Sequence, residues 1–315
     1  MSTATGAGAT GGPIQFVKGH GTENDFIILP DPDGRLGPVL TPELVRALCD
    51  RRAGLGADGV LRVVARGADP GATAMAGEAQ WFMDYRNADG STAEMCGNGA
   101  RVFARYLVDS TLARPGELTI ATRGGVRRAW AAPTGDVTVE MGPPELLAAS
   151  PRVLGRAGTA VSMGNPHVVV MLADDDELAA LDLSRPPVVN PPLPDGQNVE
   201  FVVRRGPRRI GLRVHERGVG ETRSCGTGVC AAAVAVISRD GGDGRGAPWT
   251  VDVPGGRLTV TWTTWTGDGA VHLTGPAVLV AAGELSPNWV AATAGGLPIG
   301  PPIEGRPTSG PLSRC

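Results

Sequence analysis

The feature that most constrains the fold of this chain is a sequence pattern that occurs twice, once in each half. Residues 87–99 read NADGSTAEMCGNG and precede the apolar run ARVFARYLV, and residues 217–228 read RGVGETRSCGTG and precede VCAAAVAVIS. Each copy places Cys-Gly-x-Gly directly before an apolar helical pattern. Because the two copies are a whole domain apart, the repeat indicates a duplicated domain rather than a solenoid. We expect two similar lobes that face each other.

Short β-branched runs outnumber helical patterns along the chain. Helices are expected over 42–51, with Thr41 as N-cap and Pro42 at the first helical position, and over 99–109 and 228–239. Strands are expected over 14–17, 26–29, 60–65, 79–85, 118–121, 137–141, 168–172, 198–203, 210–216, 250–253, 258–265, 270–274 and 277–281. The strands are not regularly interleaved with helices, so we expect an α+β fold with mostly antiparallel sheets.

The sequence also predicts where the lobes begin and end. We expect an N-terminal lobe over 13–140 that carries Cys96 and includes a returning strand near 275–285. A C-terminal lobe over 141–274 should carry Cys225. Residues 1–12 and the segment 286–315 are rich in Gly, Pro and small residues, which predicts a disordered arm at the start and a Pro/Gly-rich tail at the end.

Composition excludes several classes of function. The 315 residues carry 29 basic and 32 acidic side chains without a block of like charge, which argues against nucleic-acid or anionic-membrane partners. The longest apolar stretch, near 229–237, is shorter than the ~20 residues of a membrane span. Five widely spaced cysteines do not resemble a secreted disulfide framework, so we expect free thiols and a cytoplasmic protein. Lys18 is the only lysine, which argues against pyridoxal phosphate chemistry.

Two cysteines at helix starts suggest proton-transfer chemistry. A helix N-terminus is expected to lower a thiol pKa from about 8.5 and so to raise the thiolate fraction. The glycines that follow Cys96 and Cys225 let backbone N–H groups approach a carboxylate or a developing oxyanion. If the lobes face each other, one thiolate can remove an α-proton and the other thiol can return one to the opposite face. The pattern thus predicts a two-base racemase or epimerase that needs no cofactor.

At these residues the chain resembles the diaminopimelate epimerases, over about residues 14–285. The motifs that carry the resemblance are FVKGHGTENDF (16–26), GLGADG (54–59), NADGSTAEMCGNGAR (87–101), SMGNPH (162–167), NVEF (198–201) and ERGVGETRSCGTGVCAA (216–232). The resemblance implies two lobes related by a pseudo-two-fold axis, each a mostly antiparallel sheet wrapped around a central helix, with the active site between them. It also implies a cytoplasmic homodimer that interconverts L,L- and meso-diaminopimelate for lysine and peptidoglycan synthesis.

The same resemblance assigns roles to individual residues. Cys96 and Cys225 would be the catalytic pair, with His167 and Glu216 beside the thiols in support. Arg217, expected to be buried, would bind the distal carboxylate. The implied substrate-binding residues are Asn24, Asn87, Gly97, Asn98, Asn165, Asn198, Glu216, Arg217, Gly226 and Thr227. No metal and no cofactor are implied.

The sequence departs from the pattern of this family at a few positions. Gly21 is followed by Thr22 and Glu23, where many members have Leu-Gly, and Gly59 stands where many have Gln. Many members also have a third cysteine at the position where this chain has Val102 or Phe103. The first two departures concern the contacts to the substrate's amino groups, and all three leave both catalytic cysteines unchanged.

Other functions remain open at this point. GLGADG matches a dinucleotide fingerprint, but that fingerprint needs a preceding strand and a following helix, and the reverse is expected here. A zinc site could draw on Cys96, Cys225, His167 and His215, yet helix N-termini favour anions over cations. The remaining alternatives are a proline or hydroxyproline racemase-like enzyme of the same fold and a non-catalytic amino-acid-binding protein. Proton exchange at the α-carbon would separate the enzymes from the binding protein.

Overall fold

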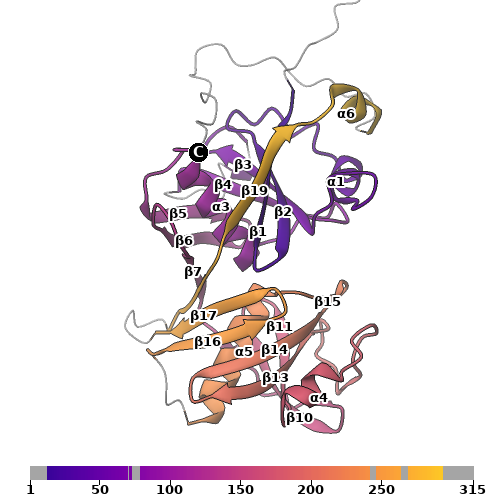
Figure 1. The fold of residues 1–315 in the computed structure, drawn as a ribbon, viewed down its shortest axis with the longest axis vertical. Helices are drawn as coiled ribbons and strands as arrows, with labels where there is room; N and C mark the ends of the chain where they lie inside the picture. The colour runs from indigo at the N-terminus through magenta and orange to yellow at the C-terminus, as the bar shows by residue number, and fades with distance from the viewer. Residues whose placement is uncertain (1–12, 70, 73–78, 242–245, 264–268, 294–315) are drawn as a thin grey trace, which may run out of the picture.

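Two lobes lie one above the other along the longest axis of the molecule (Figure 1). The computed structural model describes residues 13–69, 71–72, 79–241, 246–263 and 269–293. The arm expected over 1–12 and most of the tail expected over 286–315 therefore lie outside the described residues. Among the described residues no helix is long and apolar enough to cross a membrane.

The N-terminal lobe is one curled sheet whose neighbouring strands follow the order β19, β1, β2, β3, β4, β5, β6, β7. Their pairings are antiparallel except β2–β3 and β4–β5, which are parallel. The strands are β1 (Gln15–Gly21), β2 (Asn24–Pro30), β3 (Gly59–Ala65), β4 (Trp81–Asn87), β5 (Gly116–Thr122), β6 (Gly125–Ala131), β7 (Val137–Gly142) and β19 (Val278–Glu284).

The C-terminal lobe repeats the same pairings, in the order β10, β11, β13, β14, β16, β17, β18. Here β11–β13 and β14–β16 are parallel and the other neighbours are antiparallel, which matches β1 to β7 step by step. The strands are β10 (Arg156–Ser162), β11 (Pro166–Met171), β13 (Asn198–Gly206), β14 (Arg209–Glu216), β16 (Pro248–Val253), β17 (Gly256–Trp262) and β18 (Val271–Gly275), with short β8 (Glu145–Leu146), β9 (Arg152–Val153), β12 (Val189–Asn190) and β15 (Gly220–Thr222) beside them. The duplication seen in the sequence is thus a duplication of topology, and the predicted fold class is confirmed.

Two strands connect the lobes. β7 pairs with β6 on one edge and with β18 on the other, so the two sheets are continuous through it. The chain then returns through β19, which pairs with β1 at the far edge of the N-terminal lobe. Figure 1 shows β19 rising from the lower lobe across the upper one.

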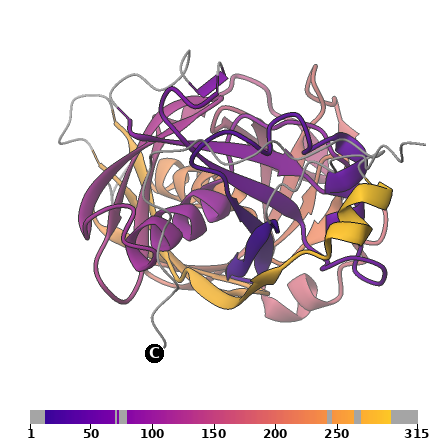
Figure 2. The ribbon, with the colours of Figure 1, turned by 90° about the horizontal axis from the view of Figure 1, so that it is seen from above.

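Each lobe encloses one helix, α3 (Gly97–Asp109) or α5 (Gly226–Arg239). All residues of α3 except Asp109 are buried, including the polar residues Asn98, Arg101 and Arg105. Figure 2 shows the strands curling around the helix when the molecule is seen from above. One apolar cluster runs through both lobes, from Val102 on α3 to Val229 on α5. Enclosure by the sheets fixes the direction of each helix and therefore the place of its first turn.

The remaining helices lie outside the sheets. In α1 (Pro42–Cys49) the N-cap is Thr41, as expected, and its Oγ1 accepts a hydrogen bond from the N–H of Leu44 at 3.3 Å. The short α4 (Asp175–Ala179) was not expected from the sequence. The same holds for α6 (Pro287–Thr293), which lies beside α1 and buries Val290. The prediction of an unstructured tail is therefore wrong for 287–293, because Val290 completes the apolar cluster that includes Leu44.

Candidate active site

Both catalytic candidates occupy the same position in their lobes, the N-cap of the central helix. Cys96 precedes α3, and its Sγ accepts a hydrogen bond from the N–H of Gly99 at 3.4 Å. Cys225 precedes α5, and its Sγ lies 3.5 Å from Oγ1 of Thr227. Both cysteines have extended backbone torsions, typical of an N-cap residue. The helix-start prediction is confirmed, with each helix beginning two residues earlier than expected.

The first turns of the two helices are in contact. A Cβ added to Gly226 would lie 3.3 Å from both the backbone N and the side-chain Oδ1 of Asn98. The backbone groups expected to bind a carboxylate, those of Gly97, Asn98, Gly226 and Thr227, thus come from two helix starts that meet. N–H groups in a first helical turn lack partners within the helix and lie at its positive end. This arrangement favours an anion where the lobes join.

Burial is the largest influence on the pKa of both thiols. It raises the pKa of Cys96 to about 11, with the charge of Glu216 adding to the effect, although the N–H groups of Gly99 and Asn98 lower it. Burial, followed by the charges of Glu216 and Glu200, raises the pKa of Cys225 well above its ordinary value. The prediction that the helix starts would lower these pKa values is therefore wrong. Removal from water destabilises a thiolate more than the helix dipole stabilises it.

Glu216, at the end of β14, lies beside Cys225. Thr222 on β15 donates a hydrogen bond to Oε1 of Glu216, and the Cys225 thiol donates another to its carboxylate. Burial nevertheless raises the pKa of Glu216. A carboxyl group with a raised pKa next to a thiol can exchange a proton with it more readily than an ordinary carboxylate.

His167, which is fully buried on β11, is held at both ring nitrogens. Its Nδ1 lies 2.7 Å from Oε1 of Glu200, and its Nε2 lies 3.0 Å from Oδ1 of Asn165. Parallel pairing of β11 and β13 sets His167 opposite Asn198. The Nδ2 of Asn198 donates to the carbonyl of Pro166 at 3.3 Å. The structure thus brings His167, Asn165 and Asn198 together.

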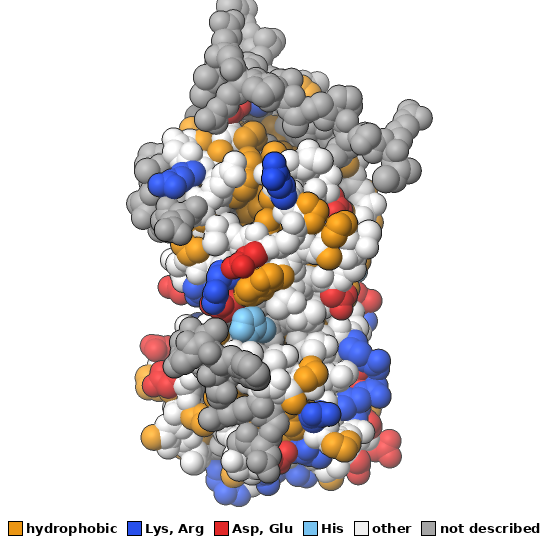
Figure 3. All heavy atoms as spheres, turned by 90° about the vertical axis from the view of Figure 1, so that its left-hand side faces the viewer, with side chains coloured by type: hydrophobic (Ala, Val, Ile, Leu, Met, Phe, Trp, Pro, Cys, Tyr) orange, Lys and Arg blue, Asp and Glu red, His pale blue; other side chains and the backbone are white. Residues whose placement is uncertain are grey.

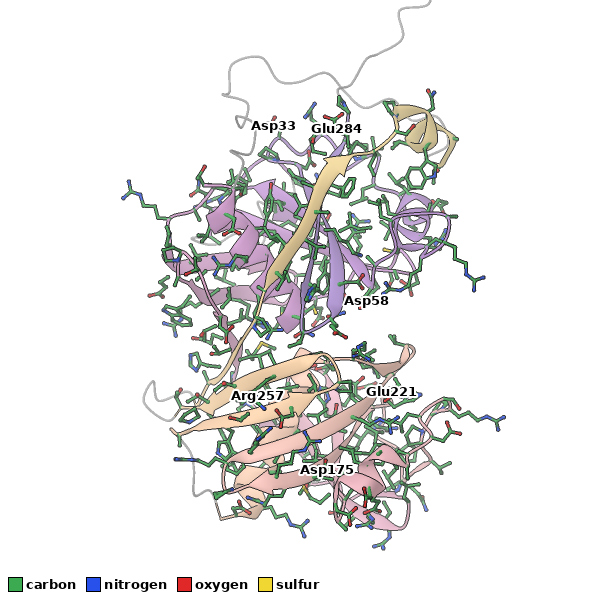
Figure 4. All side chains as sticks on the ribbon, in the orientation of Figure 1. Asp33, Asp58, Asp175, Glu221, Arg257 and Glu284 are labelled. Atoms are coloured by element: carbon green, nitrogen blue, oxygen red, sulfur yellow. The ribbon has the colours of Figure 1, made fainter. Side chains whose placement is uncertain are left out.

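The N-terminal lobe contributes the side chain of Asn24. Its Oδ1 accepts hydrogen bonds from Nδ2 of Asn98 at 3.2 Å and from the Cys96 thiol at 3.7 Å, while its Nδ2 donates to Asp58 at 2.7 Å. Asp58 lies at the end of this lobe that faces the other (Figure 4). Asn87 is in the same lobe, but its side chain and its backbone N–H form hydrogen bonds with Ser91 in its own turn and not with these residues.

Arg217 is exposed, so the expectation of a buried side chain is wrong. It lies in the turn between β14 and β15, at the edge of the sheet, where few side chains can cover it. Its guanidinium donates to the carbonyl of Asp195, and its backbone N–H donates to Oδ1 of Asn198 at 2.9 Å. The backbone of Arg217 is therefore fixed to the site through Asn198.

Three groups at the site were not predicted from the sequence. Glu200 holds His167, and Ser224 and Thr22 bridge the lobes through their hydroxyl groups, 2.8 Å apart. Glu200 belongs to the NVEF motif and interrupts an apolar strand pattern, which is the signal that could have identified it. Thr22 falls on the departure from the family pattern noted above, and it adopts a positive φ of 53°.

The surroundings of the site are mixed in charge. An open pocket at the lobe boundary is lined by Lys18, Asp25 and Arg223 among others, and neither thiol lines it. In the described part of the chain, no three His, Cys, Asp or Glu side chains are grouped to hold a metal ion. On the face in Figure 3, acidic side chains lie among the Lys and Arg side chains of the C-terminal lobe.

Comparison with solved structures relates this architecture to known folds. A phenazine biosynthesis protein of the PhzF family from Bacillus anthracis is similar with a TM-score of 0.65 and 15% identity, covering 88% of this chain and 100% of that one. A probable proline racemase from Agrobacterium radiobacter, with bound carbonate, has a TM-score of 0.62 and 18% identity, covering 90% and 96%. At these identities the likeness establishes the fold alone.

Comparison of sequences is more specific. The family model described as diaminopimelate epimerase matches residues 16–147 and 159–280. The proteins named diaminopimelate epimerase from Streptomyces coelicolor and Mycolicibacterium smegmatis are 56% and 49% identical to this chain. The alignments cover 88% and 89% of this chain and 97% and 99% of those proteins. The chain, with its two thiols at paired helix starts, belongs to the diaminopimelate epimerase family of isomerases.

Proposed function

We propose that this chain interconverts L,L- and meso-diaminopimelate by a two-base mechanism, without a cofactor, in lysine and peptidoglycan biosynthesis. The observation that carries the proposal is the contact between two helix starts, each capped by a cysteine. The names of the relatives support the choice of substrate.

In this mechanism the reacting carboxylate binds to the backbone N–H groups of Gly97, Asn98, Gly226 and Thr227. The thiolate of one cysteine takes the α-proton, so the C–H bond breaks, its electron pair moves towards the carboxylate and the thiolate becomes a thiol. The thiol of the other cysteine gives its proton to the opposite face of the same carbon and becomes a thiolate. The N–H groups stabilise the negative charge that develops between the two transfers.

The other proposed roles follow from position and chemistry. Glu216 shares a proton with Cys225, and His167, held by Glu200, supports the C-terminal side of the site. The distal amino-acid head binds to Asn24, Asn87, Asn165, Asn198, Glu216 and Arg217, since amides, a carboxylate and a guanidinium match an ammonium and a carboxylate. Arg217 must turn inward from its exposed position to reach it.

We further propose that the enzyme works in the cytoplasm as a homodimer. Catalysis by free thiols requires a reducing compartment, and Cys49, Cys96, Cys225 and Cys230 are all unpaired. On β19 the side chains of Val278 and Val280 are 41% and 60% exposed, an apolar surface that a second copy could cover. Equilibrium sedimentation would test this, and a monomer at micromolar concentration would exclude the dimer.

The reaction is tested by proton NMR of L,L-diaminopimelate with the reduced protein in heavy water. We expect loss of the α-proton signal together with appearance of the meso isomer. L-Proline and hydroxyproline serve as alternative substrates under the same conditions. Exchange of proline instead would favour a proline racemase-like enzyme, whereas exchange of none of them would favour an amino-acid-binding protein.

A further inference from the structure

Among the described residues, one fully buried arginine forms no salt bridge. Arg101, on α3, is fully buried, and only its Nη2 is hydrogen-bonded, to Oδ1 of Asn98 at 2.7 Å and to Oγ1 of Thr22 at 3.2 Å. Its Nε and Nη1 have no hydrogen-bond partner among the described residues. Burial lowers the pKa of Arg101 to about 10.

The other two buried arginines of the described residues both form salt bridges. Arg62 contacts Asp31, Asp69 and Asp84. Arg105, one turn further along α3, donates to the carbonyls of Ala132, Pro133 and Gly135 and pairs with Asp109. A buried cation without an anion is costly, and proteins retain one mainly where a partner completes it. The exception at Arg101 therefore points to an anion as the partner of its guanidinium.

The position of Arg101 indicates which anion this is. The side chain of Asn98, which Arg101 holds, crosses the lobe boundary and donates to the carbonyl of Ser224 at 3.0 Å. Ser224 directly precedes Cys225, and its hydroxyl contacts Thr22. The guanidinium thus lies behind both helix starts. Little room is left around it, since a Cβ added to Gly275 would lie 2.5 Å from Nη1.

We propose that Arg101 is a positioning residue whose charge balances the reacting carboxylate of the substrate across the paired helix starts. It acts through Asn98. The backbone N–H of Asn98 belongs to the proposed carboxylate cradle, which is formed by the N–H groups of Gly97, Asn98, Gly226 and Thr227. The side chain of Asn98 holds the two lobes in register. The charge of Arg101 also favours the enolate-like intermediate, which carries more negative charge near the carboxylate than the ground state does. This inference rests on the proposed function, because it assumes that an amino acid binds at this cradle.

The test compares Arg101→Met, Arg101→Lys and the matched control Arg105→Met, which removes a buried arginine from the same helix away from the cradle. For each we would measure kcat and KM for L,L-diaminopimelate, the urea midpoint of unfolding and the Kd of L,L-diaminopimelate by calorimetry in a Cys96→Ala background. Arg101→Met should keep or raise the unfolding midpoint, since it removes an unpaired buried charge. It should lower kcat/KM about 100-fold and weaken binding about tenfold or more.

The other two variants, Arg101→Lys and the control Arg105→Met, should behave differently from Arg101→Met. Arg101→Lys keeps the charge, and its kcat/KM should be at least about tenfold higher than that of Arg101→Met. Arg105→Met should lose stability but keep kcat/KM within about threefold of the unchanged enzyme, because its partners are main-chain carbonyls of 132–135.

Three results would overturn the inference. One is an Arg101→Met enzyme that folds and keeps kcat/KM within threefold. Another is a loss of activity in Arg101→Met and Arg105→Met that merely follows their loss of stability. If Arg101→Met fails to fold, an Arg101→Lys variant that folds without binding substrate counts equally against it. Absence of exchange by the unchanged enzyme is a separate result, which would reject the proposed function instead.

Discussion

Gly226 at the start of α5 lies against Asn98 at the start of α3, and a Cβ on Gly226 would be 3.3 Å from two atoms of Asn98. This contact joins the two halves of the duplicated fold at their equivalent first turns. Neither lobe alone would present four first-turn backbone groups and two thiols around one small anion. The closeness of the helices is therefore a requirement of the proposed reaction as well as a packing feature.

A Gly226→Ala variant should consequently lose activity while remaining folded. The added methyl group is tighter against Asn98 and Leu273 than most Cβ contacts, so the helix starts must separate by a few tenths of an ångström. Displacement of reacting groups on this scale is costly, and we expect kcat/KM to fall about tenfold or more. Gly206→Ala is the control, because its Cβ would meet one ordinary contact, with Cβ of Arg209 at 3.7 Å, at the turn between β13 and β14. Equal kinetics for both variants would show that the helix contact does not position the reaction.

The acidity of Cys96 predicts a steep pH dependence. With a pKa of about 11, the thiolate fraction at pH 7 is about one in ten thousand and rises about tenfold for each pH unit. Alkylation of Cys96 by iodoacetamide in the empty enzyme should rise accordingly between pH 7 and pH 10. Peptide mapping separates it from Cys230, whose pKa burial raises to about 12 and which should label more slowly. A plateau near pH 8.5 would mean that the helix start outweighs burial.

Much of the fold can be predicted from the sequence, because the hydrophobic pattern is clearest in the strands that are most completely buried. The strand expected over 60–65 is β3, Gly59–Ala65, and six of its seven residues are buried. β6 was missed, since its two adjacent half-buried arginines, Arg127 and Arg128, hide the alternation. The helix α6 was missed because its stability depends on distant residues such as Leu44.

For the site, the sequence identifies the residue types but not their surroundings. Cys96 and Cys225 are at helix starts as expected, yet their pKa depends on how much water the opposite lobe excludes, which no local pattern encodes. Arg101 is the last residue of the motif NADGSTAEMCGNGAR. An arginine in a helix is usually solvated, so the burial of Arg101 shows only in the folded chain.

Oxidation should inactivate the enzyme reversibly. Two thiols that serve opposite faces of one carbon must lie close together, and thiols at such a distance can form a disulfide. Treatment with a mild oxidant should abolish proton exchange, produce a Cys96–Cys225 crosslink in peptide maps and be reversed by dithiothreitol. Cys49 and Cys230, both buried in the core, should remain free. Full activity after oxidation, without the crosslink, would be incompatible with the facing-thiol arrangement.

Replacement of Glu200 by Gln should make Cys225 more reactive. After burial and the charge of Glu216, the charge of Glu200 is a further cause of the raised pKa of Cys225, so its removal should lower that pKa and raise the thiolate fraction. Alkylation of Cys225 at pH 8 should therefore be faster in Glu200→Gln. The same variant loses a charged hydrogen bond to His167, which should reduce the free energy of unfolding by about 1–3 kcal/mol.

The control for this prediction is Glu140→Gln, which removes a partly buried carboxylate that pairs with Arg128 on the neighbouring strand. It should change neither the labelling rate of Cys225 nor the proton exchange. If Glu200→Gln labels no faster than this control, then Glu200 does not act on the thiol through its charge. Its role would then be limited to holding His167, and a loss of exchange in Glu200→Gln without faster labelling would identify that case.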